Sequence, residues 1–293
     1  MKHMMRSSNS NPSSIPGKSG IGVGINLKKY LSFFRIRFTY GLQYRAAALA
    51  GIMTQFAWGA LEILMFKAFY DYDKTAFPME FSALASYIWL QQALLSLYMV
   101  WFYENELFDL ITSGNVAYEL CRPINVYDMW FVRNMASRLS KAVLRAFPIL
   151  LVAAFLPEPY GLSLPEDTGA ALWFLLSLFL AFLVVIAFCM LVYITCFYTI
   201  SSLGVRLVAA ALSEFLTGAI IPLPFFPEKV ERVVNYLPFA SMQNLPLRIY
   251  GGNVSGVKLY EGILLQLFWC AVLIAWGKWL MNRSLCKVTV QGG

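Results

Sequence analysis

The sequence has few of the side chains that soluble enzymes use for catalysis. Only 13% of its 293 residues are charged, and the single histidine, His3, lies in a polar N-terminal segment. A site that uses histidine for metal binding or acid–base catalysis is therefore not predicted, which argues against a membrane metalloprotease or desaturase. The five cysteines are scattered without a CxxC pair, so neither a disulfide framework nor a metal site is predicted.

Complete nucleotide-binding motifs are also missing. PGKSG at 16–20 resembles the end of a phosphate-binding loop, but that loop needs a glycine five residues before Gly17, where the chain has Pro12. GIGVG at 20–24 follows no strand pattern, and no LSGGQ-like signature or soluble stretch long enough for an ATPase domain is present. We therefore expect no catalytic residues, no metal and no cofactor in this chain.

Apolar residues dominate what is present. Hydrophobic residues make up 59% of the chain and the mean hydropathy is +0.61, values typical of an integral membrane protein. A span needs about 20 apolar residues. The sequence predicts an all-α membrane protein with six transmembrane helices, at 46–70, 82–103, 140–157, 169–200, 207–225 and 259–281.

The flanking segments differ from these spans in composition. Residues 1–25 are rich in Ser, Asn, Pro and Gly and predict a disordered cytoplasmic tail, and residues 282–293 predict a second cytoplasmic tail. Residues 26–45 place aromatic and basic side chains at helical spacing, which predicts an amphipathic helix in the membrane interface. A solvated connector is the alternative.

The basic residues predict the topology. Most of the 23 Lys and Arg residues lie in the N-terminal 45 residues, the connection between spans two and three, and the C-terminal end. An even number of spans places both termini on one side, and the positive-inside rule makes that side cytoplasmic. We expect a multi-pass protein of the cell membrane with both termini in the cytoplasm.

Three prolines interrupt the chain after the fifth span. Pro222, Pro224 and Pro227 cannot continue a helix, and a short amphipathic segment follows before Gly251 and Gly252. Non-helical backbone at membrane depth is tolerated where it is buried in protein or faces water. Residues 222–252 therefore predict a re-entrant extracytoplasmic hairpin that caps a pathway, with Phe225 and Phe226 beside the prolines as gate residues. An ordinary external loop is the alternative.

Polar side chains inside the spans are candidate pathway residues. Glu62 lies in the first span, and Gln91 and Gln92 are expected at a similar depth in the second. Glu62 reaching the outer headgroups is the alternative. In the fifth span, Ala209, Ser213 and Thr217 place a small residue at every fourth position, which predicts close helix packing.

Two motifs carry a family resemblance: ITSGNVAYELCRPINVY at 111–127 and GAIIPLPFFPEKVERVVNYLPF at 218–239, followed by LRIYGG at 247–252. With the interface helix and six spans, they resemble the permease subunit of a type-2 ABC exporter, over nearly the whole chain after residue 26. The resemblance implies a permease domain at 26–281 without its own ATPase. It also implies a second permease, identical or related, and two ATPase subunits that bind ATP and Mg. Membrane lipids are further expected partners, and nucleic acid is not.

The resemblance also implies a coupling region at 104–139 that contacts the ATPase. A short amphipathic helix is predicted there, followed by a stop at Ser113–Asn115 and a turn at the arginine–proline step. A helix of this kind seats in a groove through apolar anchors and charges. Packing on the chain itself is the alternative. The candidate coupling residues are Glu104, Glu106, Leu107, Asp109, Leu110, Ile111, Gly114, Asn115, Arg122 and Pro123.

Two other function classes stay open. An ion-coupled secondary carrier needs ionisable groups at the membrane midplane, and beyond Glu62 the sequence offers few. A membrane enzyme acting on lipid-linked substrates needs a cluster of acids, histidine or a nucleophile, and the acids of 104–128 are the only cluster. The cargo is not predicted.

Overall fold

The computed structural model describes residues 27–286, apart from positions 44, 123, 166 and 200, and these described residues form helices without strands. The predicted tail 1–25 lies outside the described residues. The helices are α1 (Leu27–Gly41), α2 (Arg45–Tyr72), α3 (Phe81–Ala93), α4 (Leu95–Tyr98), α5 (Asn105–Thr112), α6 (Val116–Leu120), α7 (Val126–Phe155), α8 (Thr168–Thr195), α9 (Ser202–Leu216), α10 (Glu228–Asn235), α11 (Asn244–Tyr250) and α12 (Gly256–Leu285). Single 3-10 turns lie at Lys74–Ala76 and Leu223–Phe225.

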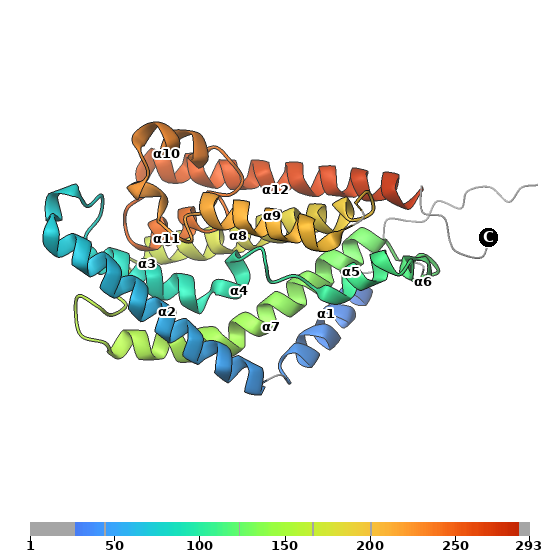
Figure 1. Ribbon diagram of the computed structural model, residues 1–293, viewed down its shortest axis with the longest axis horizontal. Coiled ribbons are helices and arrows are strands. Elements are labelled where there is room, and N and C mark those ends of the chain that lie inside the picture. Colours follow the sequence, from blue (N-terminus) through green and yellow to red (C-terminus); the bar gives the residue numbers. More distant parts are fainter. Residues whose placement is uncertain (1–26, 44, 123, 166, 200, 287–293) are drawn as a thin grey trace, which may run out of the picture.

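Three described helices are long and apolar enough to cross a membrane: Ala48–Tyr72 of α2, all of α8, and all of α12. At about 1.5 Å per residue, the 28 residues of α8 reach about 42 Å, more than the hydrocarbon core of about 30 Å. Figure 1 shows α8 and α12 along the long axis of the molecule. The predicted spans 46–70, 169–200 and 259–281 correspond to these helices, although α12 continues into the predicted tail at 282.

The other three predicted spans have a different form. Residues 82–103 divide into α3 and α4, because the backbone leaves the helical region at Leu94 and becomes extended at Met99. Residues 140–157 are only the second half of α7, which carries four basic residues between Arg133 and Arg145. Residues 207–225 contain the end of α9, which has 15 residues and reaches about 22 Å. Six full spans therefore stay a prediction.

The break after α4 is compensated by a buried arginine. Arg138 of α7, only 1% exposed, donates hydrogen bonds to the carbonyls of Ser96 at 3.1 Å, Met99 at 2.7 Å and Val100 at 3.2 Å. The end of a helix leaves carbonyl groups without intrahelical partners, and burying them unpaired is costly. Arg138 satisfies these carbonyls and thereby stabilises a non-helical segment inside the bundle.

The core forms around α8. Its buried side chains pack against α5, α7 and α12, while a second cluster joins α2, α3 and α7. Close approach needs glycine at one crossing: a Cβ atom on Gly277 of α12 would lie 2.8 Å from Cε2 of Tyr127 on α7. Nearly every residue of α3 is buried, so its apolar character serves internal packing rather than contact with lipid.

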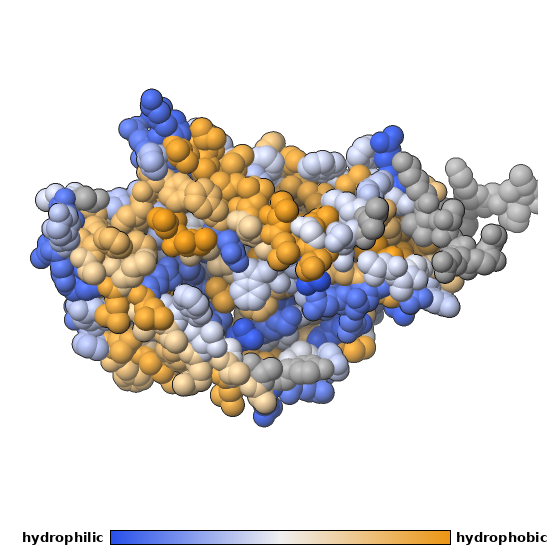
Figure 2. Space-filling view, in the orientation of Figure 1, coloured by the Kyte–Doolittle hydropathy of each residue, from blue (hydrophilic) through white to orange (hydrophobic). Residues whose placement is uncertain are grey.

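Large apolar side chains also cover much of the outer surface. Figure 2 shows apolar surface over α2 and α12, and polar surface at the tip of α10. On α12, Tyr260 is exposed near one end, and Trp276 and Trp279 are exposed near the other. These aromatic residues are 16 and 19 positions apart, or about 24 and 29 Å, which matches the aromatic belts of a membrane helix.

The N-terminal helix lies along α7 (Figure 1). A helix is observed over Leu27–Gly41, within the segment 26–45 that the sequence predicts as an interface helix, and its place in the membrane interface stays a prediction. Its ring of Phe33 packs on the core around α8, while Leu27 and Leu31 point outward. A Cβ atom on Gly41 would clash with Ser140, so the glycine permits α1 to dock closely on α7. The outward apolar side chains next to exposed lysines suit a membrane interface.

Candidate coupling site and membrane polar residues

The predicted coupling helix and hairpin lie at opposite ends of the bundle (Figure 1). The helix predicted before the Ser113–Asn115 stop is α5, and it ends at Thr112 as expected. The Ser113 hydroxyl donates to the Asp109 carbonyl at 2.6 Å, and Gly114 has a φ of 74°, which favours glycine. A sharp turn then leads into α6.

The apolar face of α5 packs against its own chain. Leu107 and Phe108 are fully buried, and Leu110 and Ile111 are half-buried against the same core cluster. The ring of Phe108 lies 4.8 Å from that of Tyr193 on α8. Leu107 therefore anchors α5 to the bundle and is not available to a partner in this conformation. Phe108 was not among the predicted residues, although it directly follows Leu107 and is buried with it.

An ion-pair network connects α5 with α1 and α7. Arg133 of α7 contacts the carboxylates of Glu106 and, at 3.6 Å, Glu104. Glu106 also lies 3.6 Å from Arg37 of α1, and Glu104 lies 3.6 Å from Lys141 of α7. Because the Arg133 side chain is almost fully buried, these contacts are screened less than surface ion pairs. The two predicted acids thus hold α5 in place.

A hydrogen-bond chain attaches the start of α5 to the core. The backbone N–H of Glu104 donates to the hydroxyl of Tyr193 at 2.7 Å, and that hydroxyl donates to Asn134 at 3.0 Å. Arg206 of α9 donates to Asn105 at 2.8 Å and lies over the ring of Phe108. The sequence could not reveal this attachment, because its partners are between 59 and 101 positions apart along the chain.

The outward face of α5 and α6 is polar, with one exposed ring. Asp109, Gly114 and Asn115 are exposed, and Tyr118 of α6 is 73% exposed. A depression of about 480 Å³ beside this face is lined by Arg37, Glu106, Asp109, Leu110, Ser113, Asn115, Glu119 and Arg133. Tyr118 was not predicted, because the apolar anchor residues were predicted only on the helix before Ser113, and Tyr118 lies on α6.

The chain after α6 turns back into the bundle. Arg122 pairs with Glu119 at 3.4 Å and is exposed, while Pro123 lies outside the described residues. Tyr127 and Trp130 are fully buried in α7. Much of the predicted coupling region at 104–139 is therefore internal structure, and only α5, α6 and the residues next to Arg122 present an outer surface.

Glu62 and Gln92 meet between α2 and α3. The Gln92 amide donates to a Glu62 carboxylate oxygen at 3.4 Å, a long hydrogen bond. The other carboxylate oxygen of Glu62, and both amide atoms of buried Gln55, have no partner among the described residues. Gln91 is placed elsewhere: it donates to the Ala219 carbonyl at 2.9 Å and accepts from Gln243 at 2.9 Å. Gln91 thus holds the turn that follows α9.

The proline-rich segment begins the hairpin and packs on α2. Pro222 and Pro227 precede the 3-10 turn and α10 respectively, and Pro224 lies within the turn. The ring of Phe225 lies 5.3 Å from Phe66 of α2, and the ring of Phe226 lies 5.3 Å from Phe215 of α9. Both phenylalanines therefore anchor the hairpin. The predicted packing residues Ser213 and Thr217 are buried, and Ala209 packs against the core around α8.

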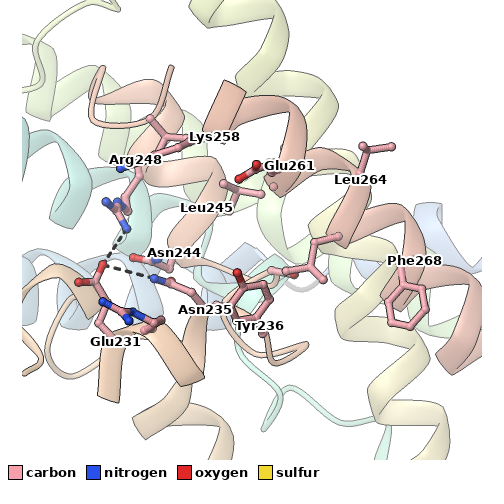
Figure 3. Close-up of a pocket in the computed structure, with 16 residues that line it drawn as sticks. Glu231, Asn235, Tyr236, Asn244, Leu245, Arg248, Lys258, Glu261, Leu264 and Phe268 are labelled. Carbon is pink, nitrogen blue, oxygen red and sulfur yellow. Dashed lines mark hydrogen bonds and ion pairs between the residues drawn. The ribbon is translucent and has the colours of Figure 1, made fainter. Parts of the chain in front are cut away.

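A pocket of about 740 Å³ opens between α10, α11 and α12 (Figure 3). Glu231 of α10 forms an ion pair with Arg248 of α11 at 3.2 Å and accepts a hydrogen bond from Asn235 at 3.4 Å. On α12, Gly262 allows Leu245 of α11 to approach, since a Cβ atom there would lie 2.7 Å from Cδ1 of Leu245. The re-entrant hairpin at 222–252 stays a prediction, and the polar lining of this pocket was not predicted from the sequence.

Comparison with known proteins identifies the family. The profile described as "ABC-2 family transporter protein" matches residues 56–292, which is most of the chain. The comparison with curated proteins gives no match. The family consists of membrane transport components, and the long apolar helices agree with a multi-pass membrane protein. This chain therefore belongs to the ABC-2 transporter family, as a membrane permease rather than a catalyst.

Proposed function

We propose that the chain is the permease subunit of an ATP-binding cassette exporter in the cell membrane. It pairs with a second permease, identical or related, and with two ATPase subunits that bind ATP and Mg. The observation that carries the proposal is the family match over 56–292, together with a short helical pair, α5–α6, at one end of the bundle. In this proposal both termini face the cytoplasm and the hairpin faces outside.

The contacts of α5 support a role in force transmission. Its inward face is fixed by Leu107 and Phe108, and its acids are paired with α1 and α7. A displacement of α5 by the ATPase is therefore passed to α7, whose 30 residues reach about 45 Å along the bundle. Closure of the ATPases on ATP then tilts the spans and opens a pathway between the two permeases.

The docking surface in this proposal is the outward face of α5 and α6. Tyr118 is the exposed aromatic anchor, and Asp109, which forms no ion pair within the described part of the chain, supplies a charge for the register. Aromatic side chains are common among the residues that carry most of the binding energy at an interface. Leu107, Leu110 and Ile111 support this surface from behind.

Tyr118→Ser tests the proposal without touching the core. We expect the affinity for the ATPase, measured by pull-down per folded permease, to fall about thirtyfold or more, since a central tyrosine contributes about 2 kcal/mol or more. Tyr72→Ser is the matched control, because Tyr72 is 93% exposed at the opposite end of the bundle. Adding Asp109→Lys to Tyr118→Ser should abolish association and ATP-dependent transport together. Unchanged pull-down by this double variant contradicts docking on α5–α6.

A further inference from the structure

The pocket between α10, α11 and α12 spans two membrane depths. Its α12 wall runs from Lys258 to Phe268, about 15 Å along the axis. Exposed Tyr260 lies on the same turns and packs edge-on against Trp173 of α8 at 5.4 Å, which marks the level of the lipid headgroups. Leu264 and Phe268 lie one and two turns deeper, at acyl-chain level. An occupant that fills this pocket must be polar at one end and apolar at the other.

The polar lining offers charges of both signs. Lys258 and Glu261 lie one turn apart on α12, and neither forms an ion pair within the described part of the chain. Their separation along the axis is about 4.5 Å. The neighbouring charges are already neutralised, because Arg248 pairs with Glu231 and Arg232 pairs with Glu228 at 2.7 Å. A zwitterionic group therefore complements the α12 wall better than a group with one charge.

Two buried atoms specify the hydrogen bonds that the ligand must make. Asn244 is 3% exposed, and its side-chain oxygen Oδ1 has no hydrogen-bond partner among the described residues. The buried Nε of Arg248 likewise lacks a partner there. A buried acceptor without a donor is costly, so these groups favour a ligand with an N–H or O–H for Asn244 and an anionic oxygen for Arg248.

We infer that this pocket binds a phospholipid whose headgroup carries a primary ammonium next to a phosphate, as in phosphatidylethanolamine. The ammonium donates to Asn244 and Glu261. The phosphate accepts from Lys258 and from the Nε of Arg248, the nitrogen that the ion pair with Glu231 leaves without a partner among the described residues. Figure 3 shows these four side chains around one opening, with Leu264 and Phe268 on the side where the acyl chains lie. The quaternary nitrogen of phosphatidylcholine has no N–H group, so it cannot satisfy Asn244.

The test measures lipid retention by the full chain purified without an ATPase, so its outcome is independent of the proposed transport function. The protein is equilibrated in detergent with equal amounts of phosphatidylethanolamine, phosphatidylcholine and phosphatidylglycerol, and bound lipid is counted by native mass spectrometry. We expect about tenfold preference for phosphatidylethanolamine over phosphatidylcholine, the size of one charge-assisted hydrogen bond. Equal retention of the three lipids, or a preference for phosphatidylglycerol, overturns the assignment.

Two variants locate the binding site. Glu261 lies on an exposed turn of α12. Glu261→Gln should therefore abolish the preference for phosphatidylethanolamine without lowering the melting temperature. Asn244→Leu removes an oxygen that has no partner among the described residues, so it should remove lipid selectivity while keeping the fold. Lys229→Gln is the matched control, because Lys229 is exposed on α10 outside the pocket lining. Unchanged selectivity in both Glu261→Gln and Asn244→Leu overturns the assignment.

A soluble competitor tests the apolar half of the site. Glycerophosphoethanolamine has the same headgroup without acyl chains, so it should displace bound phosphatidylethanolamine only at a concentration at least about a hundredfold higher, given about 0.8 kcal/mol for each buried CH₂ group. Displacement at equal concentration contradicts the contribution of Leu264 and Phe268 and leaves only a headgroup site.

Discussion

The two ends of the bundle differ in how their charged side chains are paired. At the α5–α6 end, Glu104 and Glu106 are shared among Arg37, Arg133 and Lys141, and the central guanidinium is nearly buried. At the α10–α12 end, the side chains of the Glu231–Arg248 pair are each about a fifth exposed. Lys258 and Glu261 there stay without ion pairs among the described residues.

This difference separates two physical tasks. A buried, multiply connected ion network keeps α1, α5 and α7 in one arrangement, because separating its members leaves charges uncompensated. Such an arrangement suits the transmission of a displacement. Charges without partners beside a cavity keep their capacity to bind a ligand, which suits recognition. The predictions below measure how strongly each end is held together and on which side of the membrane it lies.

Arg138→Met should have the largest effect on folding. It leaves the carbonyls of Ser96, Met99 and Val100 without their donor, and each unsatisfied buried group costs about 1–3 kcal/mol. We expect a loss of about 3 kcal/mol or more, seen as a low yield of monodisperse protein in size-exclusion chromatography. Arg35→Met, on the exposed face of α1, is the control and should behave as the unsubstituted protein. Normal yield and melting of the Arg138 variant would show that the carbonyls find other partners.

Two double-mutant cycles compare the ion pairs at the two ends directly. Their coupling energies should be smaller than the loss of stability expected for Arg138→Met. For Glu104→Gln with Arg133→Gln we expect a coupling energy of about 1–2 kcal/mol, because both side chains are mostly buried. For Glu231→Gln with Arg248→Gln we expect about 0.5 kcal/mol, because that pair is more exposed. Thermal unfolding in one detergent gives both values. Equal coupling energies, or a larger value for Glu231 with Arg248, would contradict the difference between the ends.

Thiol labelling tests on which side of the membrane each end of the bundle lies. It should leave the stability of the protein unchanged. Cys121 in the chain after α6 and Cys286 after α12 are exposed near the α5–α6 end, whereas Cys189, Cys196 and Cys270 are buried. On intact cells, an impermeant maleimide should miss both exposed cysteines and should label Glu228→Cys at the opposite end. After permeabilisation, Cys121 and Cys286 should react as well. Labelling of Cys286 on intact cells would reverse the topology proposed from the positive-inside rule.

In the predicted coupling region, the sequence located the end of α5, but it did not predict the contacts of α5 with the rest of the chain. The end of α5 before Gly114 was predictable, because the positive φ at this position favours glycine and a single residue gives the signal. The attachment of α5 at Glu104 depends on Tyr193, and the hydrogen bonds of Arg138 depend on the end of α4; both partners lie far away in sequence. Amphipathic spacing identifies an apolar face, but it cannot say whether that face contacts its own chain or a partner.

Hydropathy had a similar limit in the membrane region. It located α2, α8 and α12, whose apolar residues form long continuous helices. It could not distinguish α3, which is apolar because the chain surrounds it, from a helix that is apolar because lipid surrounds it. The interruption of the helix after α9 was predictable, since Pro222, Pro224 and Pro227 exclude a continuous helix, while the re-entrant hairpin stays a prediction. The polar lining of its pocket was not predictable, because it combines three helices.

The contact between Arg138 and the end of α4 also affects how the protein is made. The carbonyl of Val100 leaves the ribosome 38 residues before the arginine that satisfies it, a delay of about 2–8 s at ordinary elongation rates. During that interval, the segment after α4 has no donor in a lipid environment, where unpaired carbonyls are unfavourable. The first hydrophobic segments can therefore not reach their final state one at a time. We therefore expect their release into the bilayer to await α7, so that at least three segments insert together.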